Sequence, residues 1–150
     1  VGTYDGVARF PTLAAPEMEW GAEAVYEERS EGSGRTPQRT PDALEEVPCM
    51  TIDRILKDEK FVDVVHFDIQ GSELEAIKES IDTLDSKVRR VVIGTHGRDI
   101  EQGLFEFLDG RNWELEMDKA CSFQQPPDHA ITLLQDGVQV WSNRGLRSER

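Results

Sequence analysis

The sequence is poor in basic residues, and it has no long apolar run. Its 150 residues carry 17 Lys plus Arg against 30 Asp plus Glu, a formal net charge of −13. Nucleic acids and anionic membranes are polyanions, so we expect neither as a partner. No apolar run reaches the roughly 18 residues that a transmembrane helix requires. No charged-then-apolar signal peptide opens the chain, and we expect a cytoplasmic protein.

Cysteine and histidine are also scarce. The two cysteines, Cys49 and Cys121, stand far apart, without a neighbouring His and outside any Cys-x-x-Cys context. We therefore expect reduced thiols that serve packing. No pair of histidines has the spacing of metal ligands, so we predict no metal site.

The chain divides into an irregular part, residues 1–47, and a patterned part, residues 48–150. Residues 3–10 have the pattern of two short strands joined by an Asp5-Gly6 turn, which is a hairpin signal. The polar stretch from about residue 27 to 46 has no periodicity. We interpret it as a mobile loop that is either a lid or plain disorder.

Strand and helix patterns alternate in residues 48–150. Strands are predicted at 61–69, 88–95 and 113–117, and helices at 51–56, 72–84 and 100–108. Thr51 is the expected cap of the first helix, and Ser72 with Glu75 forms a capping box for the second. Residues 130–134 and 138–141 flank an Asp136-Gly137 turn, which predicts a final antiparallel pair. Two successive βα units imply right-handed crossovers and a parallel sheet.

Polar residues follow the first two strands of the predicted sheet. Asp68 and Glu73 follow one strand, and His96 follows the next. Ligands of open α/β sheets bind outside the carboxyl ends of the strands, so these side chains meet if the strands are neighbours. Such a group can accept a proton or hold a divalent metal. We favour a function for Asp68, whereas Glu73 is first a helix-dipole partner, and His96 either bonds nearby backbone or joins the site.

The same segments resemble those of a known family. Thr51-Ile52-Asp53 after a proline, followed by Asp68-Ile69-Gln70-Gly71-Ser72-Glu73, is similar to the signature of FkbM-family S-adenosylmethionine-dependent methyltransferases. Residues 91–96 and 136–143 also resemble parts of that family, and the likeness covers about residues 47–143. It implies a partial Rossmann-like class I methyltransferase sheet, with parallel strands and a C-terminal antiparallel strand pair.

The resemblance also implies roles for single residues. Asp68 and His96 would be catalytic and would remove a proton from the methyl acceptor. Asp68 and Gln70 would border S-adenosylmethionine, while Glu73, Thr95 and His96 would border the acceptor, a small molecule or a sugar. Catalysis would rest mainly on alignment for in-line methyl transfer to oxygen or nitrogen.

The sequence departs from this family because it lacks a glycine-rich cofactor loop after an apolar strand. We therefore expect the C-terminal half of a methyltransferase, which alone binds S-adenosylmethionine weakly or not at all. The alternatives are a non-catalytic interaction module that keeps the half-fold, and a metal-dependent hydrolase using Asp68, Glu73 and His96. A half sheet would leave the 61–69 strand with a bare edge. This predicts a homo-oligomer, coverage by residues 1–47, or pairing with a missing N-terminal half.

Overall fold

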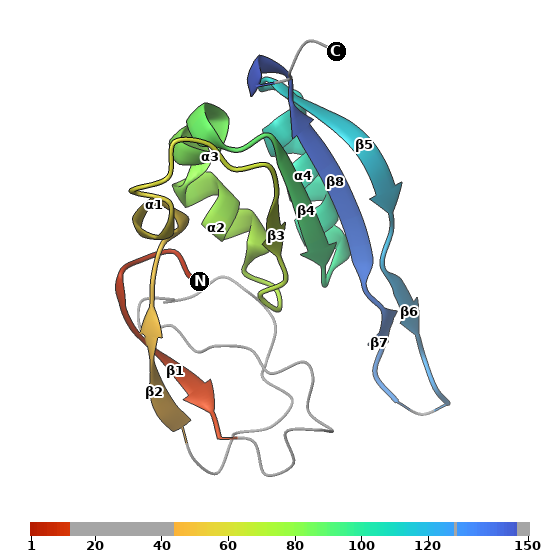
Figure 1. Ribbon diagram of the computed structural model, residues 1–150. Helices are drawn as coiled ribbons and strands as arrows, with labels where there is room; N and C mark the ends of the chain where they lie inside the picture. Colours follow the sequence, from red (N-terminus) through yellow and green to blue (C-terminus); the bar gives the residue numbers. More distant parts are fainter. Residues whose placement is uncertain (13–43, 128, 147–150) are drawn as a thin grey trace.

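The computed structural model describes residues 1–12, 44–127 and 129–146, and these form an α/β fold around a four-stranded sheet of order β3-β4-β8-β5 (Figure 1). These strands are β3 (Val65–Phe67), β4 (Arg90–Thr95), β8 (Gly137–Asn143) and β5 (Trp113–Lys119). β3 and β4 run parallel, whereas β8 lies between β4 and β5 and is antiparallel to both. The sheet is therefore mixed, and its antiparallel strand is internal rather than at the edge.

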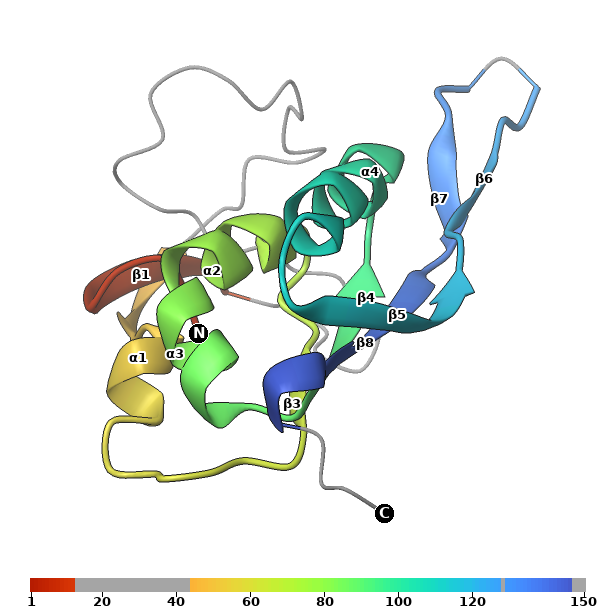
Figure 2. The ribbon, with the colours of Figure 1, turned by 90° about the horizontal axis from the view of Figure 1, so that it is seen from above.

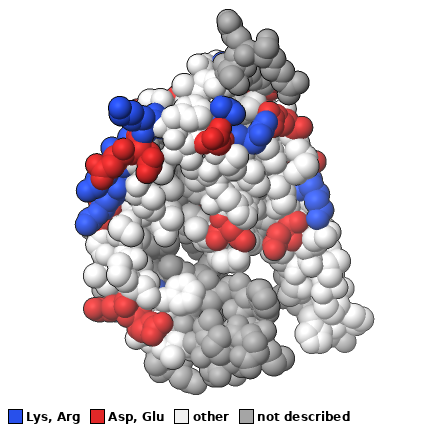
Figure 3. Space-filling view, viewed as in Figure 1, with Lys and Arg blue, Asp and Glu red and all other residues white. Residues whose placement is uncertain are grey.

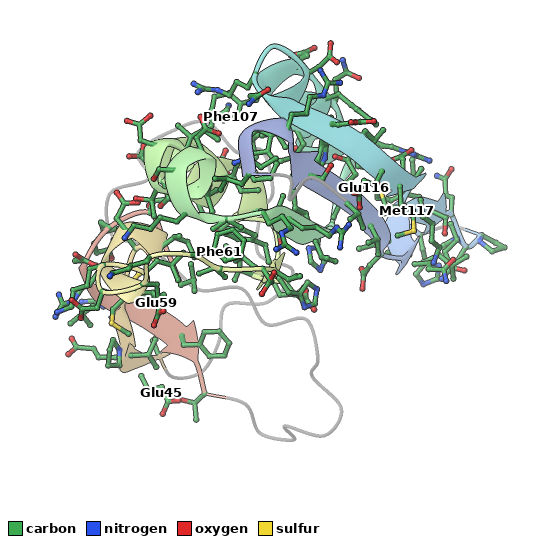
Figure 4. All side chains as sticks on the ribbon, turned by 45° about the horizontal axis from the view of Figure 1, so that its top comes forward. Glu45, Glu59, Phe61, Phe107, Glu116 and Met117 are labelled. Atoms are coloured by element: carbon green, nitrogen blue, oxygen red, sulfur yellow. The ribbon has the colours of Figure 1, made fainter. Side chains whose placement is uncertain are left out.

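The described helices are α1 (Ile52–Ile55), α2 (Glu73–Glu79), α3 (Ile81–Lys87) and α4 (Arg98–Asp109). Of these, α2 and α4 lie against one face of the sheet (Figure 2). The core between helices and sheet includes Phe67, Ile77, Leu84, Ile93, Leu104, Leu108 and Trp141. On the other face, Arg90 donates to both carboxylate oxygens of Glu116 at 2.8 and 3.0 Å (Glu116 is labelled in Figure 4). None of the described helices is long and apolar enough to cross a membrane.

Two small antiparallel sheets flank the central one. β1 (Gly6–Pro11) pairs with β2 (Leu44–Cys49), and β6 (Ser122–Gln124) pairs with β7 (Thr132–Gln135). The β6–β7 pair extends beyond the end of the central sheet, and a short 3-10 helix, Arg144–Leu146, follows β8 (Figure 1). β2 crosses the boundary predicted between residues 47 and 48. Of the predicted mobile loop, residues 27–43 lie outside the described residues.

Both predicted hairpins are wrong. In the first, Asp5 does not turn the chain back on itself; its carboxylate accepts a hydrogen bond from the backbone N–H of Thr51 at 2.9 Å, and β1 pairs with the distant β2. In the second, β7 pairs with β6 while β8 enters the central sheet, so Asp136-Gly137 is a step between two sheets. Burial explains this choice, because Trp141 of β8 is 2% exposed whereas Leu134 of β7 is 60% exposed.

The predicted order of strands and helices between residues 51 and 119 is confirmed, with local corrections. Thr51 caps α1 as expected, by accepting a hydrogen bond from the backbone N–H of Arg54. The capping box is absent, because Ser72 makes no side-chain cap, and the predicted 72–84 helix is divided at Ser80 into α2 and α3. The 61–69 strand shortens to β3 with an isolated parallel bridge from Val62 to Val88.

β3 has one strand partner, β4, among the described residues. Near its other edge Val64 is 48% exposed. Phe61 (labelled in Figure 4) is 43% exposed. The Arg89 guanidinium lies over its ring, with Cζ 5.1 Å from the ring centroid. Self-association through this edge stays a prediction.

We expect light scattering to report an assembly larger than one chain, and Val64→Lys to shift it towards the monomer, because a charge at an open edge opposes pairing. Ile131→Lys is the matched control, since Ile131 is 64% exposed on a segment far from β3. A wild-type monomer would contradict the prediction, and so would equal effects of the two variants.

Gly137 marks the entry of β8 into the sheet, and its lack of a side chain is required there. A Cβ at this position would collide with Thr95 Oγ1 and Glu101 Oε1, and would lie 2.6 Å from the backbone nitrogen of Cys121. We expect Gly137→Ala to lower the free energy of unfolding by about 1–3 kcal/mol, because these neighbours are buried and cannot move aside. Gly110→Ala, where a Cβ meets nothing within 4 Å, should leave it nearly unchanged. Denaturant unfolding of both variants and the wild type checks this. Equal free energies of unfolding for Gly137→Ala and Gly110→Ala would contradict it.

Candidate functional site

A strained turn carries Asp68 and Gln70 away from the end of β3. Gln70 and Gly71 have φ values of 53° and 97°, in the left-handed region that non-glycine residues rarely adopt. The side chain of Glu73, the first residue of α2, folds back over this turn. Its carboxylate accepts hydrogen bonds from the backbone N–H groups of Ile69 at 3.1 Å and of Gly71 at 3.0 Å. The helix start thus holds the turn in its unusual conformation.

His96 joins this turn from the end of the neighbouring strand, β4. Its Nδ1 lies 2.9 Å from Glu73 Oε1, and its Nε2 lies 3.4 Å from Asp68 Oδ1 and 3.9 Å from Asp136 Oδ1. The prediction that Asp68 and His96 meet beyond the strand ends is therefore confirmed. Glu73 is fully buried and His96 is 6% exposed, whereas Asp68 and Asp136 are more than half exposed. The group runs from a buried carboxylate, through the imidazole, to carboxylates at the surface.

The contacts of the pair shift both pKa values towards the charged forms. Burial alone would raise the pKa of Glu73, but the hydrogen bonds from His96 and from the backbone, with the charge of His96, leave it below 4.5. The hydrogen bond to Glu73 raises the pKa of His96 above 6.5, against the effect of burial, and the charges of Glu73, Asp136 and Asp68 add to the rise. In mildly acidic solution the two groups therefore form a buried ion pair.

The remaining predicted site residues have different surroundings. Gln70 Nε2 donates to Asp68 Oδ1 at 3.4 Å, so these two side chains lie together on the turn. Thr95 is fully buried, and its hydroxyl donates to Glu101 Oε1 at 2.9 Å. The same oxygen of Glu101 accepts from the backbone N–H of Cys121. The acceptor-binding roles of Thr95 and Glu73 stay predictions, and both side chains are closed to solvent in this structure.

A metal ion would find few available ligands in this group. Asp68, Glu73 and His96 each offer a ligand atom, all within 4.8 Å of one another. Both oxygens of Glu73 are already occupied by hydrogen bonds from His96 and the turn. The hydrolase reading required all three side chains as ligands. We therefore assign no metal role to these residues.

Asp136 is the residue that sequence reasoning missed. Its Asp-Gly context indicated a turn, but the step from β7 to β8 brings its carboxylate within 3.9 Å of His96 Nε2. Its place follows from the antiparallel pairing of β4 with β8, because Gly137, the first residue of β8, lies opposite Thr95 at the end of β4. The sequence pattern did not indicate this pairing. In the view of Figure 1, acidic residues lie at the surface over the lower ends of β3 and β4 (Figure 3).

The ion pair makes stability depend on pH in a defined direction. The raised pKa of His96 contributes stability below pH 6.5 that is lost as the pH rises through that pKa. The lowered pKa of Glu73 contributes stability above pH 4.5 that is lost as the pH falls through it. We therefore expect His96→Asn, which keeps an N–H donor, to be most destabilising between pH 4.5 and 6.5. Denaturant unfolding at several pH values measures this.

His66→Asn is the control for that series, because His66 is exposed on β3 and outside the group. Its effect on the free energy of unfolding should not follow the same pH profile. A destabilisation by His96→Asn that is independent of pH would contradict the assignment of a buried ion pair.

Comparison with known proteins gives the family. A family model described as the methyltransferase FkbM domain matches residues 1–124. A curated protein named "Putative methyltransferase" from Jannaschia sp. (strain CCS1) is 40% identical over 115 residues, which are 77% of this chain. The chain spans 40% of the length of that relative. No solved structure matches the chain. The matched domain contains the whole β3–α2 turn and His96, and the chain belongs to the FkbM methyltransferase family.

Proposed function

We propose that this chain carries the acceptor side of an S-adenosylmethionine-dependent methyltransferase that methylates an oxygen or nitrogen of a small molecule or sugar. The observation that carries the proposal is the meeting of Asp68, Gln70 and His96 at the carboxyl ends of two parallel strands. Family membership supplies the reaction class. The sheet supports the finer fold, a class I methyltransferase sheet in part, because the parallel pair β3–β4 continues into an antiparallel strand.

Charge at the strand ends suits this cofactor. Asp68 and Asp136 are exposed carboxylates that both lie within 3.9 Å of His96 Nε2, in a chain with a formal net charge of −13. When bound, S-adenosylmethionine supplies a methyl group on a positively charged sulfur. A negative surface attracts such a cation and raises its local concentration. Gln70 lies beside Asp68 and can contribute an amide to the same surface.

The chemical step needs alignment and one proton acceptor. The acceptor hydroxyl or amine gives its proton to His96 or Asp68, and its electron pair forms the bond to the methyl carbon. The bond between sulfur and methyl breaks, and its electron pair stays on sulfur. Alignment of the two reactants supplies most of the rate enhancement, and the positioned base contributes about 10²–10⁴-fold.

One observation favours a second function. The sequence has no Gly-x-Gly pattern after an apolar strand, although the family uses such a loop to hold the cofactor. A chain without this loop can serve as a non-catalytic interaction module that keeps the same fold. Binding of S-adenosylmethionine separates the two functions.

The test is a titration of the isotopically labelled chain with S-adenosylmethionine, followed by nuclear magnetic resonance, which also detects weak binding. We expect saturable shifts at Asp68, Gln70 and His96, and an apparent affinity several-fold lower in Asp68→Asn. Asp82→Asn, an exposed carboxylate on α3, is the matched control and should bind as the wild type does. Shifts scattered over the surface, or none at saturating cofactor, would contradict the proposal and favour the interaction module.

A further inference from the structure

We propose that Glu73 is a positioning residue that holds the ring of His96 so that proton transfer takes place at Nε2. This inference rests on the proposed methyltransferase function, and it deepens that function by assigning the base. The family resemblance implied that Glu73 contacts the acceptor directly; here Glu73 acts on the acceptor only through His96.

The first support is the complete burial of Glu73. Its side chain is 0% exposed, so a bound acceptor cannot reach it without a rearrangement of the turn. Its carboxylate accepts hydrogen bonds from His96 and from the backbone N–H groups of Ile69 and Gly71. An ionised carboxylate only accepts hydrogen bonds, so its partner atom on the ring must carry the proton. Glu73 therefore selects the form of neutral His96 with hydrogen on Nδ1.

The second support is the direction in which the opposite ring nitrogen points. Nε2 faces Asp68 Oδ1 at 3.4 Å and Asp136 Oδ1 at 3.9 Å, and both of these carboxylates are at the surface. Among the described residues, the charged groups that face the ring are thus Glu73 from α2, Asp68 after β3 and Asp136 before β8. The two surface carboxylates stabilise the imidazolium that forms when Nε2 takes the proton from the acceptor.

The third support is that one side chain positions both halves of the site. The carboxylate that holds His96 also holds the left-handed turn at Gln70 and Gly71, and that turn carries Asp68. Base and turn are therefore placed relative to each other through a single buried group. This is the arrangement of a nucleophile or base oriented by a third residue, which several classes of enzyme use.

The test observes His96 directly and needs no methyl acceptor. Nitrogen-15 chemical shifts of imidazoles distinguish the two neutral forms and follow protonation during a pH titration, and His96→Asn assigns the signal. In the wild type we expect neutral His96 to carry its hydrogen on Nδ1, with a titration midpoint above 6.5. In Glu73→Gln we expect that midpoint to fall and the other neutral form to become populated. Glu101→Gln is the matched control, because Glu101 is a second buried carboxylate, 5% exposed, that bonds Thr95 instead.

A neutral wild-type ring with its hydrogen on Nε2 would overturn the inference, and so would a ring that stays doubly protonated in alkaline solution, because Nε2 could then accept no proton. Equal titrations in Glu73→Gln and Glu101→Gln would also overturn it. If Glu73→Gln does not fold, the wild-type measurement alone decides. The outcome is independent of cofactor binding, so failure of this inference and failure of the proposed function are distinguishable.

Discussion

The hydrogen bond between Glu73 and His96 is the contact on which the geometry of the strand ends depends. Nδ1 and Oε1 lie 2.9 Å apart in a place where the carboxylate has no access to water. A charge in such a place is stable only when donors surround it, and here the imidazole and two backbone N–H groups do so. Removing one member of a buried pair costs about 3–5 kcal/mol, because the other is left uncompensated. This hydrogen bond therefore fixes the positions of β3, β4 and α2 relative to one another.

The contact between Glu73 and His96 also orders the carboxylates at the surface. The surface carboxylates of Asp68 and Asp136 belong to loops, which alone would hold them loosely. The His96 ring is held by its hydrogen bond to Glu73. Both carboxylates lie close to the other nitrogen of this ring, Nε2, with Asp68 Oδ1 at 3.4 Å and Asp136 Oδ1 at 3.9 Å. A negative, ordered surface of this kind is suited to a cationic sulfur and to an acceptor that must lose a proton. The same buried interaction therefore serves stability and the proposed chemistry together.

Sequence patterns predicted the features that depend on residues close together in the chain and on the spacing of the apolar residues that each element buries. The succession of strands and helices, the cap at Thr51, and the meeting of Asp68 with His96 follow from short-range periodicity and from the rule for parallel neighbours. Pairings between distant strands were not accessible in this way. Asp-Gly is a turn signal whether or not the flanking strands pair with each other, and this hid the place of Asp136. The contacts of Glu73 were hidden too, because a helix-dipole role and a buried ion pair place the same residue type at the same position.

A double-mutant cycle on Glu73 and His96 tests the central claim most directly. The free energy of unfolding would be measured at mildly acidic pH for the wild type, Glu73→Gln, His96→Asn and the double variant. Side chains that interact as described should show a coupling energy of about 1–3 kcal/mol, with the double variant less destabilised than the sum of the single ones. Additive effects, within about 0.5 kcal/mol, would show that the two side chains do not depend on each other and would contradict the account.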